Sequence, residues 1–208
     1  MLYPKLKFPK VLKRPFFYTN FVATLDGKVA VDKDGYWPIG SKKDYQTLLE
    51  LRSHADCLIH GGTLGKLYGD QTLESISKES FSKLRKNHGK DEKLPYYVMT
   101  NKPGKLVNFA NKITIFSGDL KSLVKELNAK GYKNVLVEGG PTLLGSFLKE
   151  ELIDEVFLTI APKIYGSKIP FTKTLVEGVL LPSNKFKLKL ISVKIVQDEL
   201  FLRYNLRT

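Results

Sequence analysis

NVLVEGGPTLLGSFL, which runs from Asn134 to Leu148, changes from a strand pattern to a helix pattern at a pair of glycines. Residues 135–137 are aliphatic and mostly β-branched, which predicts a short strand buried on both faces. Pro141 suits the first turn of a helix, where its missing N–H costs nothing, and the leucines after it recur at helical spacing. The stretch therefore predicts a strand followed at once by a helix, as in an open α/β sheet.

The turn between this strand and this helix carries a carboxylate and two glycines. Glu138 stands at the carboxyl end of the strand, and Gly139 and Gly140 permit a backbone path that side chains would block. In an open α/β sheet, ligands bind at such strand ends, and the free N–H groups at a helix start bind phosphate. An ordinary strand-to-helix connection is the alternative, and the spacing does not match the G-x-G-x-x-G fingerprint. Burying an unpaired carboxylate costs free energy, so we interpret Glu138 as a functional residue.

Length and composition indicate one folded domain with anionic partners. The 208 residues are 42% hydrophobic and include 12 Phe and 10 Tyr, which is enough to fill a core. The formal net charge of +13 favours nucleotides, phosphorylated metabolites, nucleic acid or an acidic membrane surface as partners. The single Cys57 excludes an intramolecular disulfide and fits a reducing compartment. We find no membrane-spanning run and no signal peptide, so we expect a cytoplasmic protein.

Strand and helix patterns alternate through the middle of the chain. The predicted strands cover residues 16–25, 28–31, 57–60, 96–100, 113–116, 135–137, 155–161, 185–193 and 194–206. The predicted helices begin after Ser41, at Thr63, at Asp119 and at Pro141. Alternation predicts a largely parallel sheet, and the helix-free end predicts an antiparallel C-terminal hairpin. The predicted fold class is α/β, with a mixed, mostly parallel sheet flanked by helices.

Residues 1–208 are predicted to form a single domain, because we see no internal repeat and no interdomain linker. Residues 1–15 are basic and proline-punctuated, which indicates an extended lead-in. Residues 69–95 are polar and lack a clear apolar period, which predicts a surface excursion that is partly helical around residues 80–85.

Several segments of the sequence together resemble the pyrimidine reductase family of riboflavin biosynthesis. They are ATLDGKVA at 23–30, LRSHAD at 51–56, GTL at 62–64, VEGGPTL at 137–143, LIDE at 152–155 and IAPK at 160–163. The resemblance runs from Phe16 to about residue 206 and implies a fold like that of dihydrofolate reductase. No deaminase segment accompanies these motifs, so we expect the freestanding form.

The resemblance implies an NADPH-dependent reduction of the ribosyl group of 5-amino-6-(5-phosphoribosylamino)uracil to a ribityl group. A hydride would pass from the nicotinamide to the sugar C1′ through an open-chain imine. The cofactor carries the redox chemistry, while the protein orients and polarises the reactants. Many members of the family are homodimers, and the apolar C-terminal strands are where we expect such an interface.

The resemblance implies cofactor contacts along two turns and one loop. The residues are Ala23, Trp37, Thr63, Lys102, Gly139, Gly140, Pro141, Thr142 and Leu143. The helix start after Gly140 would embrace the pyrophosphate, and we expect the Gly139–Gly140 peptide to be cis. Lys102 replaces a cluster that includes an arginine in the family, so it would meet a 2′-phosphate as a point charge without a planar fork.

Arg52, Glu138 and Gly35 fall where the family contacts its substrate. Arg52 offers a planar donor fork for a phosphate or carbonyl, or it forms the solvent end of an amphipathic helix, and the sequence leaves both interpretations open. Glu138 and Asp26 are the candidate catalytic residues, with bound water as the alternative proton donor. Asp26 is followed by Gly27, which also makes it a turn former.

The substrate half of the family pattern is altered in this chain. Residues 64–73 lack the proline and arginine of the family's substrate-binding stretch, Asn20 stands where a lysine is common, and Gly35 where a serine is common. A dihydrofolate- or pterin-type reductase on the same scaffold is therefore the alternative. A basic nucleic-acid-binding domain is a third hypothesis, although we recognise no such motif.

We accordingly expect a small anionic heterocyclic substrate, no specific nucleic acid and no membrane partner. His54, His60 and His88 do not form a ligand cluster, so we predict no metal site. Cys57 lies in an apolar strand, which argues against a cysteine nucleophile.

Overall fold

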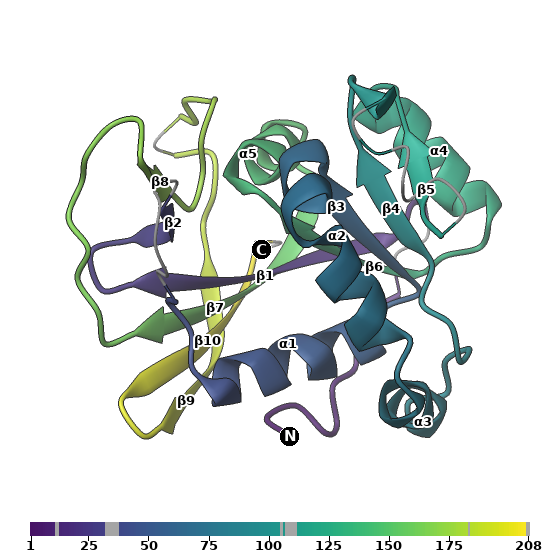
Figure 1. Cartoon of the computed structure of the whole chain (residues 1–208), viewed down its shortest axis with the longest axis horizontal. Helices are drawn as coiled ribbons and strands as arrows, with labels where there is room; N and C mark the ends of the chain where they lie inside the picture. The colour runs from purple at the N-terminus through teal and green to yellow at the C-terminus, as the bar shows by residue number, and fades with distance from the viewer. Residues whose placement is uncertain (11–12, 32–37, 105, 107–111, 183, 207–208) are drawn as a thin grey trace. The chain divides into compact units, whose positions relative to one another are not determined.

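The computed structural model describes residues 1–10, 13–31, 38–104, 106, 112–182 and 184–206 (Figure 1). Contacts divide the chain into two compact units. The first contains residues 3–17 and 49–140 with Met1, and the second contains residues 18–48 and 141–208 with Leu2. Because β1 (Phe16–Thr24) starts in the first unit and ends in the second, it belongs to both.

Parallel strands form the centre of the first unit. β3 (Cys57–Gly61) pairs in parallel with β4 (Tyr96–Met99) and with β6 (Asn134–Gly139). β4 also pairs in parallel with β5 (Thr114–Phe116). The aliphatic side chains of β3 and β6 are fully buried, which confirms the prediction of a strand buried on both faces before the glycine pair.

Helix α4 (Leu120–Ala129) has the amphipathic pattern that its sequence predicts, and all of its leucines are buried. Asp119 caps the helix, since its carboxylate accepts a hydrogen bond from the Ser122 backbone N–H at 2.7 Å. Gly131 follows the helix with a φ of 75°, a left-handed conformation that favours glycine. The local sequence signals at both ends of this helix are therefore confirmed.

Helices α2 (Gly62–Ile76) and α3 (Glu79–Asn87) occupy most of the stretch 69–95, where the sequence predicts a polar surface excursion. The buried face of α2 consists of small and polar residues with one isoleucine: Gly65, Gly69, Thr72, Ser75 and Ile76. A face of this composition leaves no large apolar period in the sequence, so the helix over residues 69–76 was not predicted. Helix α3 confirms the predicted helical part around residues 80–85. A Cβ at Gly65 would lie 2.7 Å from Val98 Cγ1, so glycine allows α2 to approach β4 closely.

Arg85 of α3 is another buried residue in the stretch expected at the surface. Its side chain is 1% exposed and donates hydrogen bonds to the backbone carbonyls of Ala55 at 2.7 Å and Asp91 at 2.6 Å. The guanidinium thus supplies donors to carbonyls that burial would otherwise leave unsatisfied. Arg85 joins the turn before β3 to the loop before β4.

Antiparallel pairing connects the C-terminal strands of the second unit. β10 (Glu199–Asn205) pairs with β7 (Ile153–Ala161) on one side and with β9 (Lys189–Val196) on the other. This confirms the predicted antiparallel hairpin. Its turn lies at residues 197–198, a few residues later than expected, and Gln197 has a φ of 52° there.

A second, two-stranded sheet lies in the same unit. β2 (Lys28–Val31) pairs antiparallel with β8 (Thr172–Thr174). Residues 28–31 are thus a strand, as predicted, but they do not continue the preceding strand. Gly27 has a φ of 78°, so the chain turns between the two strands.

Helix α1 (Lys42–Ser53) begins in the second unit and ends in the first. The Ser41 hydroxyl accepts hydrogen bonds from the backbone N–H groups of Lys43 and Asp44 at 3.0 and 3.2 Å, which confirms the predicted cap. Tyr45 of this helix is 48% exposed, whereas Arg52 near its end is 5% exposed.

The eight main strands have the order β5-β4-β3-β6-β1-β7-β10-β9. The sheet is mixed, with parallel pairing at its β5 end and antiparallel pairing at its β9 end. This architecture confirms the predicted α/β class. Among the described residues, no helix is both long and apolar enough to span a membrane.

Candidate functional site

Glu138 occupies an irregular position at the end of β6. Val137 pairs with Ile59 of β3, whereas Gly139 pairs with His60, so the register shifts by one residue at Glu138. A bulge of this kind bends the strand and re-aims the side chain of the extra residue. The Glu138 side chain is directed into the first unit and its residue is only 7% exposed.

Arg52 binds both oxygens of the Glu138 carboxylate. Its Nε–H donates to Oε1 at 2.7 Å and its Nη2–H donates to Oε2 at 2.6 Å. Burial alone would raise the pKa of Glu138, but the charge and hydrogen bonds of Arg52, helped by His60, outweigh it and hold that pKa at about 2. Glu138 is therefore a charged carboxylate over the whole physiological pH range.

The remaining donor of Arg52 is also directed inward. Nη1 donates to Ser75 Oγ at 3.1 Å, and the Ser75 hydroxyl donates to the Thr72 backbone carbonyl at 2.8 Å. Because Arg52 is 5% exposed, the interpretation that it forms the solvent end of a helix is wrong. Its guanidinium bonds Glu138 and Ser75, and its contact with substrate stays a prediction.

His60 and Tyr96 complete this cluster, and sequence reasoning did not find them. His60 Nε2 lies 2.8 Å from Glu138 Oε2, and His60 Nδ1 lies 2.8 Å from the Tyr96 hydroxyl. His60 is 1% exposed and Tyr96 is 3% exposed. Burial, followed by the negative charge of Glu138, raises the pKa of Tyr96, so its hydroxyl stays protonated. One signal was available: His60 is the only titratable side chain in the otherwise apolar run 58–60.

The carboxyl ends of the parallel strands bring several predicted cofactor residues to one edge of the first unit. β3 leads directly into α2, which starts at Gly62 and contains Thr63, and Gly61 before it provides no side-chain cap. Gly139 lies opposite His60 on the neighbouring strand. The uncapped N–H groups of the first turn of α2 therefore lie at the same edge as the glycine pair.

Lys102 follows β4 at this edge. It is exposed, and its backbone N–H donates to Thr100 Oγ1 at 3.1 Å. A Cβ at Gly62 would lie 2.6 Å from the same Thr100 oxygen, so the start of α2 approaches this turn closely. Thr63, Lys102 and Gly139 are thus carried by the ends of adjacent strands.

The Gly139–Gly140 peptide is cis, as the resemblance implied. A Cβ added at Gly140 would meet no atom within 4 Å, so open space lies beside this peptide. Helix α5 (Pro141–Lys149) follows in the second unit, and Thr142 and Leu143 belong to its first turn. Their contact with a cofactor remains a prediction.

Asp26 anchors a loop of the second unit. Its carboxylate accepts hydrogen bonds from the Thr24 hydroxyl at 2.6 Å and from the backbone N–H groups of Tyr165 and Gly166 at 3.2 and 2.8 Å. The Thr24 hydrogen bond, with smaller help from the two backbone donors, lowers its pKa, although residual desolvation opposes the shift. Asp26 thus stabilises its own turn and binds the backbone of residues 165–166. Its catalytic role stays a prediction.

Other predicted residues fall elsewhere. Ala23 is buried in β1 with 3% exposure. Gly35 and Trp37 lie outside the described residues.

Burial raises the pKa of the Cys57 thiol, which agrees with its assignment as an unreactive strand residue. In the part of the chain that the structure describes, no three His, Cys, Asp or Glu side chains are grouped to hold a metal ion.

Asp44, which is partly buried, is influenced by the charge of the buried Glu199, and the sequence did not indicate this relation. Ser41 donates to the Glu199 carboxylate through its backbone N–H at 3.0 Å and its hydroxyl at 2.5 Å. Burial, together with the negative charge of Glu199, raises the pKa of Asp44 to about 6, although a hydrogen bond with Thr159 opposes the shift. Asp44 thus exchanges its proton close to neutral pH.

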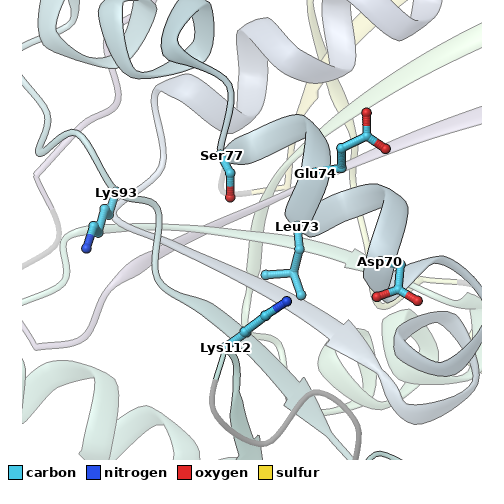
Figure 2. A pocket seen from close by; sticks show the side chains of 6 residues that line it. All are labelled: Asp70, Leu73, Glu74, Ser77, Lys93 and Lys112. Carbon is cyan, nitrogen blue, oxygen red and sulfur yellow. The ribbon is translucent and has the colours of Figure 1, made fainter.

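A groove with polar side chains along it lies on the first unit (Figure 2). It has a volume of about 510 Å³ and is lined by Asp70, Leu73, Glu74, Ser77, Lys93 and Lys112. The groove contains charges of both signs, and none of the predicted site residues lines it.

Comparison with known proteins gives a family and structural neighbours of the same fold. Residues 15–202 match the family model described as the RibD C-terminal domain. The 2,5-diamino-6-ribosylamino-4(3H)-pyrimidinone 5′-phosphate reductase of Archaeoglobus fulgidus is 22% identical over 185 residues, covering 74% of this chain and 84% of the relative.

The solved structures show the shared fold. A pyrimidine reductase-like protein from Corynebacterium diphtheriae superimposes with a TM-score of 0.69 at 17% identity, covering 93% of this chain and 92% of that one. Dihydrofolate reductase from Enterococcus faecalis, solved with NADP(H), gives 0.55 at 11% identity, covering 91% and 95%. The dihydrofolate-reductase-like fold expected from the sequence is confirmed.

Proposed function

Because the chain belongs to the RibD C-terminal domain family, we propose that it is an NADPH-dependent pyrimidine reductase of riboflavin biosynthesis. Its substrate would be a 6-ribosylaminopyrimidine 5′-phosphate, whose ribosyl group is reduced to ribityl. The observation that carries the proposal is the family match over residues 15–202, which includes the strand, the Glu138 bulge and the glycine turn. We propose that the chain acts as one domain in the cytoplasm.

Two pyrimidines are candidates for the substrate ring. The resemblance in sequence named 5-amino-6-(5-phosphoribosylamino)uracil, whereas the Archaeoglobus relative is named for the 2,5-diamino compound. The two differ at ring position 2, where the uracil has a carbonyl that accepts a hydrogen bond and the diamino compound has an amine that donates. A protein group that bonds one of them is left unpaired by the other, so the chain should discriminate strongly between them.

The strand-end edge of the first unit fits the phosphates of NADPH. The first turn of α2, which contains Thr63, has no side-chain cap, and open space lies beside Gly140. Unpaired N–H groups at a helix start attract phosphate oxygens. Lys102 is exposed at the same edge and would contribute a positive charge to the 2′-phosphate. Pro141 to Leu143 would add the start of a second helix.

The carboxylates of the chain are suited to stabilise positive charge. When bound, NADPH supplies the hydride that reduces C1′ of the open-chain imine. Glu138 and Asp26 both have lowered pKa values, so each is held as an anion. An anion stabilises a protonated imine, which is the more reactive electrophile, whereas donating a proton would require a higher pKa. We therefore propose that these two residues act as fixed negative charges.

Turnover with purified protein tests this function. We expect NADPH to raise the melting temperature by mass action and NADH to do so less. The nicotinamide absorbance should fall when one of the two pyrimidines is added and much more slowly with the other. Lys102→Ala should weaken NADPH binding and leave NADH binding unchanged, because NADH has no 2′-phosphate. Lys121→Ala, on α4, is the matched control. Turnover of dihydrofolate without turnover of either pyrimidine would replace the proposed substrate with the pterin-type alternative.

An uncovered apolar face in the second unit supports a homodimer. In the β7-β10-β9 register, Leu200 pairs with Ile160 and Ile195, and Leu202 pairs with Leu158 and Val193. Directly paired residues point to the same face of a sheet, and Ile195 is 70% exposed on this face. A contiguous apolar face of this kind marks an interaction surface, and we propose a second copy of the chain as its occupant.

Sedimentation analysis tests the dimer. We expect the unchanged chain to be dimeric and Ile195→Lys to be monomeric, with the same circular dichroism. Leu180→Lys is the control, because Leu180 is 98% exposed and lies outside these strands. A monomeric unchanged chain, or equal dissociation by both variants, would contradict the proposal.

A further inference from the structure

The buried cluster around Glu138 includes His60 and Tyr96, to which the proposed function assigns no role. Arg52 binds both carboxylate oxygens from one direction. From another direction, His60 bonds Oε2 and is itself bonded to the Tyr96 hydroxyl. Tyr96, His60 and Glu138 come from three adjacent parallel strands, so the three side chains form a line across β4, β3 and β6.

The bulge explains why Glu138 needs a second support. Regular pairing would constrain the backbone on both sides of this residue, but the register shift leaves it as the extra residue of its strand. Arg52 holds both carboxylate oxygens, but it does so from one direction only. The hydrogen bond from His60 to Oε2 adds a second direction of support, because its donor belongs to the neighbouring strand β3.

Both ring nitrogens of His60 have partners, which settles the orientation of the ring. Its Nε2 donates to the Glu138 carboxylate, which can only accept. Its Nδ1 meets the Tyr96 hydroxyl at 2.8 Å, and the two rings pack edge to face with centroids 5.0 Å apart. Tyr96 therefore holds His60, and His60 holds Glu138.

We propose that His60 and Tyr96 are positioning residues of the reductase, which fix the Glu138 carboxylate in the direction required for turnover. The inference rests on the proposed function, in which Glu138 is the anion that stabilises the protonated imine. Neither His60 nor Tyr96 needs to touch the substrate. An apolar pair of similar volume would fill the same space without buried polar groups to satisfy, so a purely structural role does not require these residue types.

Steady-state kinetics of three variants test the proposal. His60→Leu removes the donor to Glu138, and kcat should fall about tenfold while the NADPH dissociation constant stays within about twofold. His60→Gln can still donate an N–H toward Oε2 and should recover most of the loss. Tyr96→Phe leaves the imidazole in place without its second partner and should give an intermediate fall in kcat.

Tyr97→Phe is the matched control for Tyr96→Phe. Tyr97 is the next residue of the same strand, is 1% exposed and bonds Glu126 of α4 through its hydroxyl at 2.8 Å. The two variants lose the same chemical group from buried residues, but the Tyr97 hydroxyl bonds Glu126, whereas the Tyr96 hydroxyl bonds His60. We expect comparable losses in melting temperature from both, and a loss in kcat from Tyr96→Phe alone.

Two results would overturn the inference. One is equal kcat for His60→Leu, His60→Gln and the unchanged chain, and the other is equal kcat losses for Tyr96→Phe and Tyr97→Phe. Absence of turnover by the unchanged chain would instead reject the proposed function. In that case an acid titration of the Glu138 carboxyl by ¹³C NMR still tests the contact, because its pKa should be higher in His60→Leu than in the unchanged chain. An unaltered titration would show that His60 does not hold Glu138.

Discussion

Glu138 in the first unit is a buried carboxylate and Asp44 in the second a partly buried one, and their pKa values move in opposite directions. Arg52 and His60 donate to Glu138 and hold its pKa at about 2. Burial and the neighbouring charge of Glu199 raise the pKa of Asp44 to about 6. The two carboxyl groups are chemically alike, so their different behaviour comes from their partners.

The comparison indicates what each carboxylate can do. Glu138 cannot release or take up a proton near neutral pH and is suited to act as a permanent negative charge. Asp44 exchanges a proton close to neutral pH and contributes a stability that varies with pH. Removing Arg52, the partner of Glu138, should therefore lower the free energy of unfolding. Removing the charge of Asp44 should raise it.

The largest effect is expected from Arg52→Met. This change leaves the Glu138 carboxylate buried without its main partner, and we expect a loss of about 3 to 5 kcal/mol in the free energy of unfolding, measured in urea at pH 7. The double variant Arg52→Met/Glu138→Gln should recover part of that loss, since it also removes the uncompensated charge. A double variant less stable than Arg52→Met would show that the pair does not act as an ion pair.

A gain in stability is expected from Asp44→Asn. The folded-state pKa of Asp44 is about 6 against an unfolded value near 3.8, so the carboxyl costs stability as pH rises through 6. The amide should stabilise the fold by about 1 to 3 kcal/mol at pH 7. The gain should shrink between pH 6 and pH 4, as the carboxyl of the unchanged chain becomes protonated. A gain that is the same at both ends of this range would contradict the raised pKa.

In the unchanged chain, His54 should offset the pH dependence of stability that Asp44 causes. Burial and the nearby His88 and Lys90 lower its pKa from 6.5 to about 4, and its Nε2 has no hydrogen-bond partner among the described residues. Its contribution to stability is complete above pH 6.5 and is lost as pH falls toward 4, which is opposite in sign to that of Asp44. In His54→Gln, melting temperatures should therefore fall less between pH 7 and pH 4.5 than in the unchanged chain.

The smallest effect is expected from Glu199→Gln. Removing this charge should lower the pKa of Asp44 from about 6 toward its ordinary value, by less than burial raises it, because burial is the larger cause. The Asp44 carboxyl resonance followed by NMR between pH 3 and pH 8 measures the shift. Lys42→Gln, an exposed residue of the same helix, is the control. An unchanged Asp44 titration would show that burial alone raises its pKa.

The sequence predicted the elements that have regular apolar patterns or clear end signals. Examples are the fully buried strand before Glu138, and helix α4 with Asp119 at its start and Gly131 after its end. It predicted the start of α2 near Thr63 but not its extent to Ile76, because the buried face of this helix uses glycine, threonine and serine and so has no apolar period to detect. It also placed Arg85 at the surface, because nothing in the local sequence indicates the carbonyl groups that this side chain binds.

The sequence identified residues of the candidate site but did not predict which of them contact one another. Glu138 and Arg52 were identified as important residues, and the sequence did not indicate that they bind each other, since 86 residues separate them. His60 was considered only as a metal ligand, and its partners belong to the two neighbouring strands. Glu138 drew attention as an unpaired buried carboxylate, but the structure supplies its pair.

The sequence by itself determined the fold class, the strand-to-helix turn at Gly139 and Gly140, and the family to which the chain belongs. These features depend on residues close together along the chain, where backbone geometry and periodic burial act directly. The tertiary structure alone decided which charges meet. Glu138 became a fixed anion and Asp44 an exchangeable acid, because the pKa of a buried carboxyl depends on partners that folding brings from distant parts of the sequence.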